Sequence, residues 1–354
     1  MEKIAKKYQE VINIFLRNER MSSSDIHNEL KKNGHDISLV TVKRMVSEMA
    51  ETGLLKVTGA GRSTQYAIMS PARLFSEIDA RQYIALDPDK RYGLSGYNFD
   101  LFHSMPSDIF TNEELQRLEA VSAEYGKGII GLPQTLQKKE LERLIVELSW
   151  KSSKIEGNTY TLLDTEKLLL ENKEAPGHNK QEAHMILNHK DAFLFIWNNP
   201  THFKTLTRTN LEELHALLVK DLDVDAGVRT HAVGITGSRY RPLDNAHQIN
   251  DAIESLIRAA SYMQTPYARG LIALLGISYI QPFHDGNKRT GRLMANALLL
   301  ANSCTPPSYR SVDEDEYREA TLVFYELNSI MPMKNIFISQ YEFAVQNYAV
   351  KKNP

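Results

Sequence analysis

QPFHDGNKRTGR, residues 281–292, is the stretch that decides the fold of this 354-residue chain. Upstream of it, residues 271–280 are apolar nearly all round, as in a helix buried at the centre of a domain. Downstream, apolar residues recur at helical spacing from Leu293 to Ala301, which places Asn287 near the start of a second helix. The stretch is therefore expected to be a loop between two helices of a mainly α domain.

The composition of this loop favours an anion. Free backbone N–H groups and the positive end of the helix dipole attract negative charge, and Gly286 lets the backbone approach it closely. Lys288, Arg289 and Arg292 add positive charge, and Asp285 has the oxygen ligands that a divalent metal prefers. We interpret the loop as a phosphate cradle; a basic helix start with a glycine turn is the alternative.

The loop resembles the signature of the Fic (Fido) family, His-Pro-Phe-x-Asp/Glu-Gly-Asn-Gly/Lys-Arg-x-x-Arg. The resemblance implies a Fic-type helical bundle that binds ATP and Mg²⁺ and transfers AMP to a hydroxyl of a target protein, here unknown. It assigns the metal to Asp285 and the catalytic positions to Gln281, Asp285, Asn287 and Arg289. It assigns nucleotide binding to Gly286, Asn287, Lys288, Arg289, Gly291 and Arg292.

Gln281 stands where the family has its catalytic His. A neutral amide has no usable pKa near 7 and cannot serve as the general base, a role that typically supplies roughly 10²–10⁴-fold. We therefore expect AMP transfer that is weak, lost or altered. Lys288 stands where Gly is commoner in AMP-transferring members. The Doc toxins, which are phosphotransferases, also carry Asn-Lys-Arg at this place, so a Doc-like phosphotransferase is a lesser alternative.

A helix end near residues 142–157 carries a second motif. Ser152 and Glu156 are four residues apart, on one helical face, and Gly157 is suited to ending the helix. The spacing resembles the inhibitory-helix motif Ser/Thr-x-x-x-Glu-Gly/Asn of a Fic subgroup. The resemblance implies that Glu156 pairs with Arg292 and blocks the γ-phosphate; a surface helix end with a solvated Glu is the alternative.

Residues 227–243 break the helical pattern. Alternating apolar residues at Val233 and Ile235, followed by Gly237, predict a short β-hairpin. The segment resembles the Fic flap, which holds the target by strand-like backbone pairing; a plain hairpin is the alternative. The resemblance assigns target docking to Ile235, Thr236, Gly237, Ser238 and Tyr240.

The first 70 residues predict a small separate module. Three helices, the second and third capped by Ser22 and Ser38, precede two strands at residues 54–57 and 65–68. Residues 1–70 resemble a winged helix-turn-helix, which implies DNA as an alternative partner and a nucleotide-responsive transcriptional regulator as the alternative function. The candidate DNA contacts are Thr41, Lys43, Arg44, Ser47 and, on the wing, Arg62.

The rest of the chain divides into a linker with an irregular segment at residues 71–106 and a Fic domain at residues 107–350. The formal net charge of −2 gives no global attraction to nucleic acid or membrane. The single Cys304 excludes an intramolecular disulfide, and neither a signal peptide nor a membrane-length apolar run is expected. We expect a cytoplasmic protein without a membrane partner; a homodimer is left open.

Overall fold

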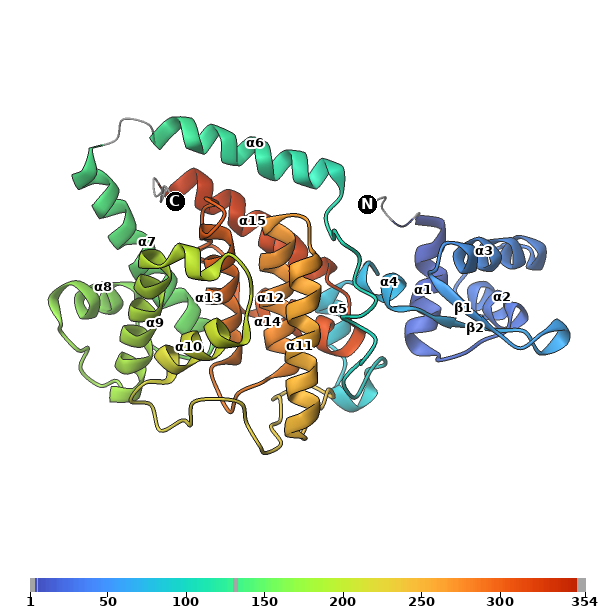
Figure 1. The fold of residues 1–354 in the computed structure, drawn as a ribbon. Coiled ribbons are helices and arrows are strands. Elements are labelled where there is room, and N and C mark those ends of the chain that lie inside the picture. The colour runs from blue at the N-terminus through green and yellow to red at the C-terminus, as the bar shows by residue number, and fades with distance from the viewer. Residues whose placement is uncertain (1–3, 5, 130–132, 349–354) are drawn as a thin grey trace. The chain divides into compact units, whose positions relative to one another are not determined.

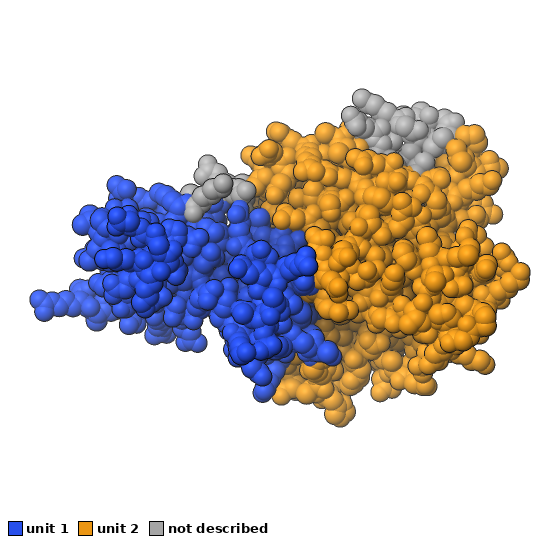
Figure 2. All heavy atoms as spheres, turned by 180° about the vertical axis from the view of Figure 1, so that it is seen from behind, with its two compact units in different colours: residues 1–106, 235–241, 319–333 blue, residues 107–234, 242–318, 334–354 orange. Residues whose placement is uncertain are grey.

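The computed structural model describes residues 4, 6–129 and 133–348 (Figure 1). The mainly α fold is confirmed, and the strands that these residues form belong to one two-stranded sheet. The chain divides into two compact units, coloured separately in Figure 2. Unit 1 comprises residues 1–106, 235–241 and 319–333, and unit 2 comprises residues 107–234, 242–318 and 334–354.

Unit 1 begins with the predicted winged helix. Ser22 and Asp25 form a capping box at the start of the second helix, and the Ser38 hydroxyl accepts a hydrogen bond from the Thr41 amide at the start of the third. The antiparallel strands pair Leu55 with Ile68. These elements are α1 (Lys6–Arg17), α2 (Ser23–Lys32), α3 (Leu39–Glu51), β1 (Leu55–Thr58), the 3₁₀ turn η1 (Gly61–Ser63) and β2 (Gln65–Ile68).

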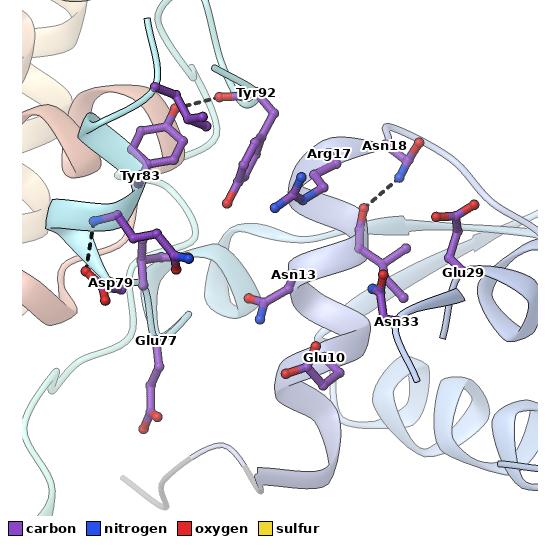
Figure 3. Close-up of a pocket in the computed structure, with 14 residues that line it drawn as sticks. Glu10, Asn13, Arg17, Asn18, Glu29, Asn33, Glu77, Asp79, Tyr83 and Tyr92 are labelled. Atoms are coloured by element: carbon purple, nitrogen blue, oxygen red, sulfur yellow. Dashed lines mark hydrogen bonds between the residues drawn. The ribbon is translucent and has the colours of Figure 1, made fainter. Parts of the chain in front are cut away.

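The segment that follows the winged helix shares its core. Ala72 and Tyr83 are buried in one apolar cluster with Phe15 and Val46, and Val323 and Leu327 complete that cluster from the other end of the chain. The segment's elements are α4 (Ser70–Leu74), α5 (Ala80–Ile84) and the 3₁₀ turn η2 (Pro88–Lys90). A cavity of about 510 Å³ lies between α1 and residues 77–92, and carboxylate and amide side chains are among those that line it (Figure 3).

Unit 2 is a bundle of helices around α12 (Pro266–Ile280), which is buried at every position from 270 to 280. Helix α13 (Asn287–Leu300) packs along α12, and α11 (Ala246–Tyr262) covers another side of it (Figure 1). The other helices of the bundle are α6 (Asn112–Ile129), α7 (Gln134–Ile155), α8 (Leu162–Glu171), α9 (Lys180–Asn198), η3 (Pro200–Phe203) and α10 (Arg208–Val219).

Two further helices contribute to both units, α14 (Glu314–Leu327) and α15 (Met331–Asn347). In the described part of the chain, no helix combines the length and apolarity that crossing a membrane requires.

Candidate nucleotide site

The loop between α12 and α13 is held in shape by Asn287. Its side-chain oxygen accepts a hydrogen bond from the Phe283 amide (2.9 Å), and its side-chain nitrogen donates to the Phe283 carbonyl (2.8 Å). Gly286, at φ 78°, precedes the first turn of α13, where Thr290 donates to the Gly286 carbonyl through both its amide (2.8 Å) and its hydroxyl (2.9 Å). The loop is therefore a fixed turn that ends at a helix N-terminus.

Gln281 ends α12 in the left-handed region, at φ 52°. Its side-chain nitrogen donates to the Ser278 carbonyl (2.7 Å), and its side-chain oxygen accepts from Asn287 (2.9 Å). The amide therefore joins the end of α12 to the start of α13. It offers no proton acceptor with a pKa near neutrality.

Arg289 and Asp285 form the charged pair of the loop. Arg289 is 1% exposed and donates to the Asp285 carboxylate (2.8 Å), whereas Asp285 is 60% exposed. Burial lowers the pKa of Arg289, although Asp285 opposes that shift. The Arg289 Nη1 atom has no hydrogen-bond partner among the described residues. A buried guanidinium with a donor to spare, next to a helix N-terminus, suits an anion.

Asp285 alone does not form a complete metal site. The described residues contain no group of three His, Cys, Asp or Glu side chains placed to hold a metal ion. Mg²⁺ is usually bound by one or two carboxylates together with phosphate oxygens and water, so the exposed Asp285 fits a metal that arrives with a nucleotide.

Arg292 is fully buried and is held by the end of α7. Its Nε donates to the Ser152 hydroxyl (3.0 Å), and its Nη2 donates to the Ser152 carbonyl (2.7 Å) and to the Glu156 carboxylate (2.9 Å). Gly157, at φ 94°, ends the helix in a Schellman turn and so places Glu156 at its C-cap. The pairing of Glu156 with Arg292 is therefore present in this structure.

The other oxygen of Glu156 pairs with Lys288 (2.7 Å), so one carboxylate lies between two cations of α13. Burial by itself would raise the pKa of Glu156, but Arg292 and Lys288 outweigh it and hold that pKa at about 2. Glu156 is thus a carboxylate at neutral pH and occupies the position of an anion at the start of α13.

Two residues outside the predicted site also hold the loop. The His215 ring stacks on Phe283 at 3.6 Å, and its Nε2 donates to the Asp285 carbonyl (3.0 Å). Burial lowers the pKa of His215 to about 4. Arg229, at the base of the flap, donates to the Gln281 carbonyl through Nε (2.6 Å) and to the Pro282 carbonyl through its amide (3.0 Å). His215 is a lone His in the sequence, and Arg229 matches the flap pattern, but neither signal predicts a contact with the loop.

The flap corrects the predicted hairpin. Within the described residues, positions 231–240 contain a turn, with Ser238 donating to the Ile235 carbonyl (3.2 Å), and no strand. Arg241 instead forms an isolated parallel bridge with Gly96. The prediction failed because alternation alone does not supply a strand partner, and here the backbone bonds to another segment. Tyr240 is buried against Tyr325, so its side chain belongs to the core.

Gly291 serves packing in this structure. A Cβ at this position would lie 2.8 Å from the Leu274 carbonyl oxygen, so the glycine allows α13 to approach α12. In the winged helix, the candidate DNA contacts lie at or near the surface: Lys43, Arg44, Ser47 and Arg62 are exposed, and Thr41 is half-buried.

Comparisons with known protein families find two separate matches. The model of the Fic/DOC family matches residues 205–299, which include the loop, and that of the ferric uptake regulator family matches residues 2–74. The chain therefore carries a Fic/DOC domain and, ahead of it, a region of the ferric uptake regulator type with a winged-helix fold.

Two relatives show how far the sequence similarity extends. The protein adenylyltransferase fic-1 of Caenorhabditis elegans is 28% identical over 202 residues, which cover 55% of this chain and 39% of the relative. The protein adenylyltransferase Fic of Nematostella vectensis is 24% identical over 196 residues, which cover 51% and 44%. The chain thus spans less than half the length of these relatives.

Solved structures share the fold. Fic-1 (aa134–508) from C. elegans has a TM-score of 0.54 and 18% identity, and the match covers 67% of this chain and 70% of that chain. A Fic family protein from Desulfovibrio desulfuricans G20 has a TM-score of 0.53 and 23% identity, with coverages of 68% and 75%.

Proposed function

We propose that this Fic/DOC-domain chain is an ATP–Mg²⁺-binding protein built as a protein adenylyltransferase, in which Gln281 weakens or removes AMP transfer and Glu156 restrains nucleotide binding. The observation that carries the proposal is the anion-ready start of α13, where Glu156 occupies both Lys288 and Arg292. We also propose the division of the chain into a winged helix at residues 1–70, a linker with an irregular segment at 71–106 and a Fic domain at 107–350. The proposed location is the cytoplasm, where ATP is available.

Nucleotide phosphates fit the start of α13. Backbone N–H groups there have no helical partner, and Lys288, Arg289 and Arg292 supply charge-assisted hydrogen bonds. Mg²⁺ bound to these phosphates and to Asp285 would neutralise their charge. Because Glu156 already pairs with Lys288 and Arg292, nucleotide binding requires the carboxylate to move or to share these cations. This competition is the restraint.

AMP transfer forms a bond between a target oxygen and the α-phosphorus, releases pyrophosphate and needs a group that takes the hydroxyl proton. Gln281 cannot take this proton, and both ends of its amide bond to the loop. Positioning and charge neutralisation remain in place, so the scaffold keeps the part of catalysis that does not depend on a base.

The test is transfer of labelled AMP from ATP and Mg²⁺, by self-modification and onto a lysate of the source cell. We compare the native chain, Glu156→Gly, Glu156→Gly with Gln281→His, and the exposed-site control Glu166→Gln. Labelling by the double variant alone supports the proposal. Labelling by Glu156→Gly with Gln281 intact would show that the loop needs no imidazole base.

Phosphotransfer, the lesser alternative, is tested in the same reactions with label on the γ-phosphate. A Doc-like enzyme labels protein from the γ-phosphate and not from the α-phosphate. The choice of label therefore separates the two reactions without a change of variant.

A second candidate function, a DNA-binding regulator that responds to nucleotide, is favoured by the ferric uptake regulator match over residues 2–74. Lys43 and Arg44 are exposed on α3, the helix that would enter the major groove. We expect Lys43→Ala with Arg44→Ala to weaken binding to the DNA upstream of the chain's own gene, whereas Lys139→Ala on α7 does not. A gel shift with and without ATP measures this; equal binding by all variants would contradict it. Light scattering of the same protein tests the homodimer.

A further inference from the structure

Three segments of unit 1 meet at the carboxylate of Glu326, near the end of α14. Its side chain is 0% exposed. One oxygen accepts a hydrogen bond from the Tyr83 hydroxyl (2.8 Å), and the other accepts from the Arg91 guanidinium (3.2 Å), itself only 5% exposed. Tyr83 also lines the cavity beside α1, where it bonds the Tyr92 carbonyl (Figure 3).

The flap residues 235–241 are bonded to the same group. The Ser238 hydroxyl donates to Glu326 (2.7 Å), and the Arg239 amide donates to the same oxygen (3.3 Å). Arg91 also donates to the Gly237 carbonyl (2.9 Å), and the Arg239 guanidinium donates to the Arg91 carbonyl. Glu326 and Arg91 therefore hold the flap through both its side chains and its backbone.

The segment after Arg91 follows the flap. Ser95 accepts a hydrogen bond from the Arg241 amide (3.0 Å), and Leu94 donates to the Glu326 carbonyl (2.6 Å). Gly93, at φ 100°, passes so close to α14 that a Cβ there would lie 2.4 Å from the Glu326 carbonyl oxygen. This close approach explains why a glycine stands at the position.

These contacts replace the hairpin that the sequence predicted. A hairpin fixes its backbone by a ladder of hydrogen bonds between its own strands. Apart from the turn between Ile235 and Ser238, the backbone of residues 235–241 bonds instead to Glu326, Arg91 and Ser95. A buried carboxylate is costly unless its hydrogen bonds are satisfied, and a satisfied buried network favours one geometry. The flap conformation is thus set by residues outside 205–299, the range that matches the Fic/DOC family.

We propose that Glu326 is the positioning residue of the flap: together with Arg91 and Ser238 it holds the backbone of residues 235–241 in the conformation that docks an extended segment of a target protein. The inference rests on the proposed function of the flap. The partner is a polypeptide that pairs through its backbone, so the network sets the geometry of docking and leaves nucleotide affinity unchanged.

The experiment uses the full chain carrying Glu156→Gly and Gln281→His as the parent. Into it we introduce Ser238→Ala, Ser238→Thr, Glu326→Gln or the control Ser261→Ala. Ser238 is half-buried, and Ser238→Ala removes only the hydroxyl that the flap donates to Glu326, so we expect the variant to fold. Glu326→Gln changes the buried group itself. Three quantities are measured: hydrogen exchange of residues 235–241, the Kd for ATP, and labelled AMP transfer to a lysate of the source cell.

We expect Ser238→Ala and Glu326→Gln to speed exchange of the flap amides and to lower transfer, each by about tenfold or more, with the Kd for ATP within about twofold of the parent. Ser238→Thr, which keeps the hydroxyl, restores both quantities, and Ser261→Ala changes neither.

Parent-like flap exchange in Ser238→Ala would overturn the proposal. So would parent-like transfer despite faster exchange, because the network would then hold the flap without serving docking. If the parent itself transfers no AMP, the proposed function fails on its own, and docking of a target fails with it. The exchange rates then still decide whether Glu326 holds the flap.

Discussion

Lys288 and Glu156 form an ion pair of 2.7 Å that joins the start of α13 to the end of α7. The sequence resemblance predicted only the pairing of Glu156 with Arg292, which is also present, at 2.9 Å. The carboxylate therefore contacts two of the cations that we assign to the nucleotide. A phosphate that displaces Glu156 breaks the two ion pairs of this carboxylate and forms its own contacts with Lys288 and Arg292. The restraint therefore depends on both cations.

Lys288 pairs with Glu156 in this structure and is proposed to pair with a phosphate of bound ATP. The effect of Lys288 on ATP binding therefore depends on whether Glu156 is present. In the native chain, Lys288→Ala changes the ATP affinity little, since the ammonium is already paired. In the Glu156→Gly background the same change weakens ATP binding about tenfold, which corresponds to a coupling energy of about 1.4 kcal/mol. Calorimetric Kd values for the four chains measure this coupling. Additive effects would contradict the prediction, and Lys139→Ala serves as the control.

Asn287 is expected to contribute to stability as well as to the site. Asn287→Ala removes the hydrogen bonds to the amide and carbonyl of the buried Phe283 and the one to the Gln281 side-chain oxygen. We expect a loss of roughly 2–4 kcal/mol in the free energy of unfolding, seen as a fall in Tm. The exposed Asn302→Ala, which removes one local hydrogen bond at the end of α13, costs less than about 1 kcal/mol. Equal Tm values for the two variants would refute the assignment.

Two glycines of the central helix pair form a matched test of packing. At Gly291 a Cβ would meet the Leu274 carbonyl at 2.8 Å, whereas at Gly270 the nearest atom would be 3.4 Å away. We expect Gly291→Ala to destabilise the chain by about 1–3 kcal/mol, because α13 must move away from α12. Gly270→Ala is expected to be neutral or stabilising by up to about 1 kcal/mol, because Ala favours the helix. Thermal unfolding of both variants decides this.

The buried His215 predicts a stability that falls with acid. Its pKa is lowered from 6.5 to about 4, so between these pH values the unfolded chain takes up a proton that the folded chain does not. The contribution of neutral His215 to the free energy of unfolding is fully present above pH 6.5. About 3 kcal/mol of this free energy is lost as the pH falls to 4. His215→Gln should flatten this part of the pH profile, leaving the share that comes from His189, whose pKa burial also lowers. The exposed-site control His247→Gln should keep the native slope.

Much of the fold follows from local patterns in the sequence. The caps at Ser22 and Ser38 and the glycine at Gly157 lie where predicted, because capping depends on only a few neighbouring residues. The loop after α12 was also evident, since an apolar helix, a glycine and three cations occur within one short stretch.

The parts that could not be predicted depend on residues distant in sequence. The second pairing of Glu156, with Lys288, requires the relative placement of α7 and α13. His215 and Arg229 act through backbone carbonyls of the loop, and a carbonyl carries no residue signature. The hairpin prediction for the flap was wrong because the Gly237 carbonyl bonds to Arg91, a residue more than 140 positions earlier in the chain. No local periodicity reports such a partner.

Unit 1 is assembled from the beginning, the middle and the end of the chain. The cluster that contains Phe15 and Val46 also needs Val323 and Leu327, and more than 200 residues separate residue 106 from the segment that starts at residue 319. At a synthesis rate of roughly 5–20 residues per second, the first 106 residues wait about ten to forty seconds on the ribosome for the helix that completes their core. The newly synthesised winged helix therefore has an incomplete core, and remains exposed to chaperones and proteases, until residues 319–333 have been translated.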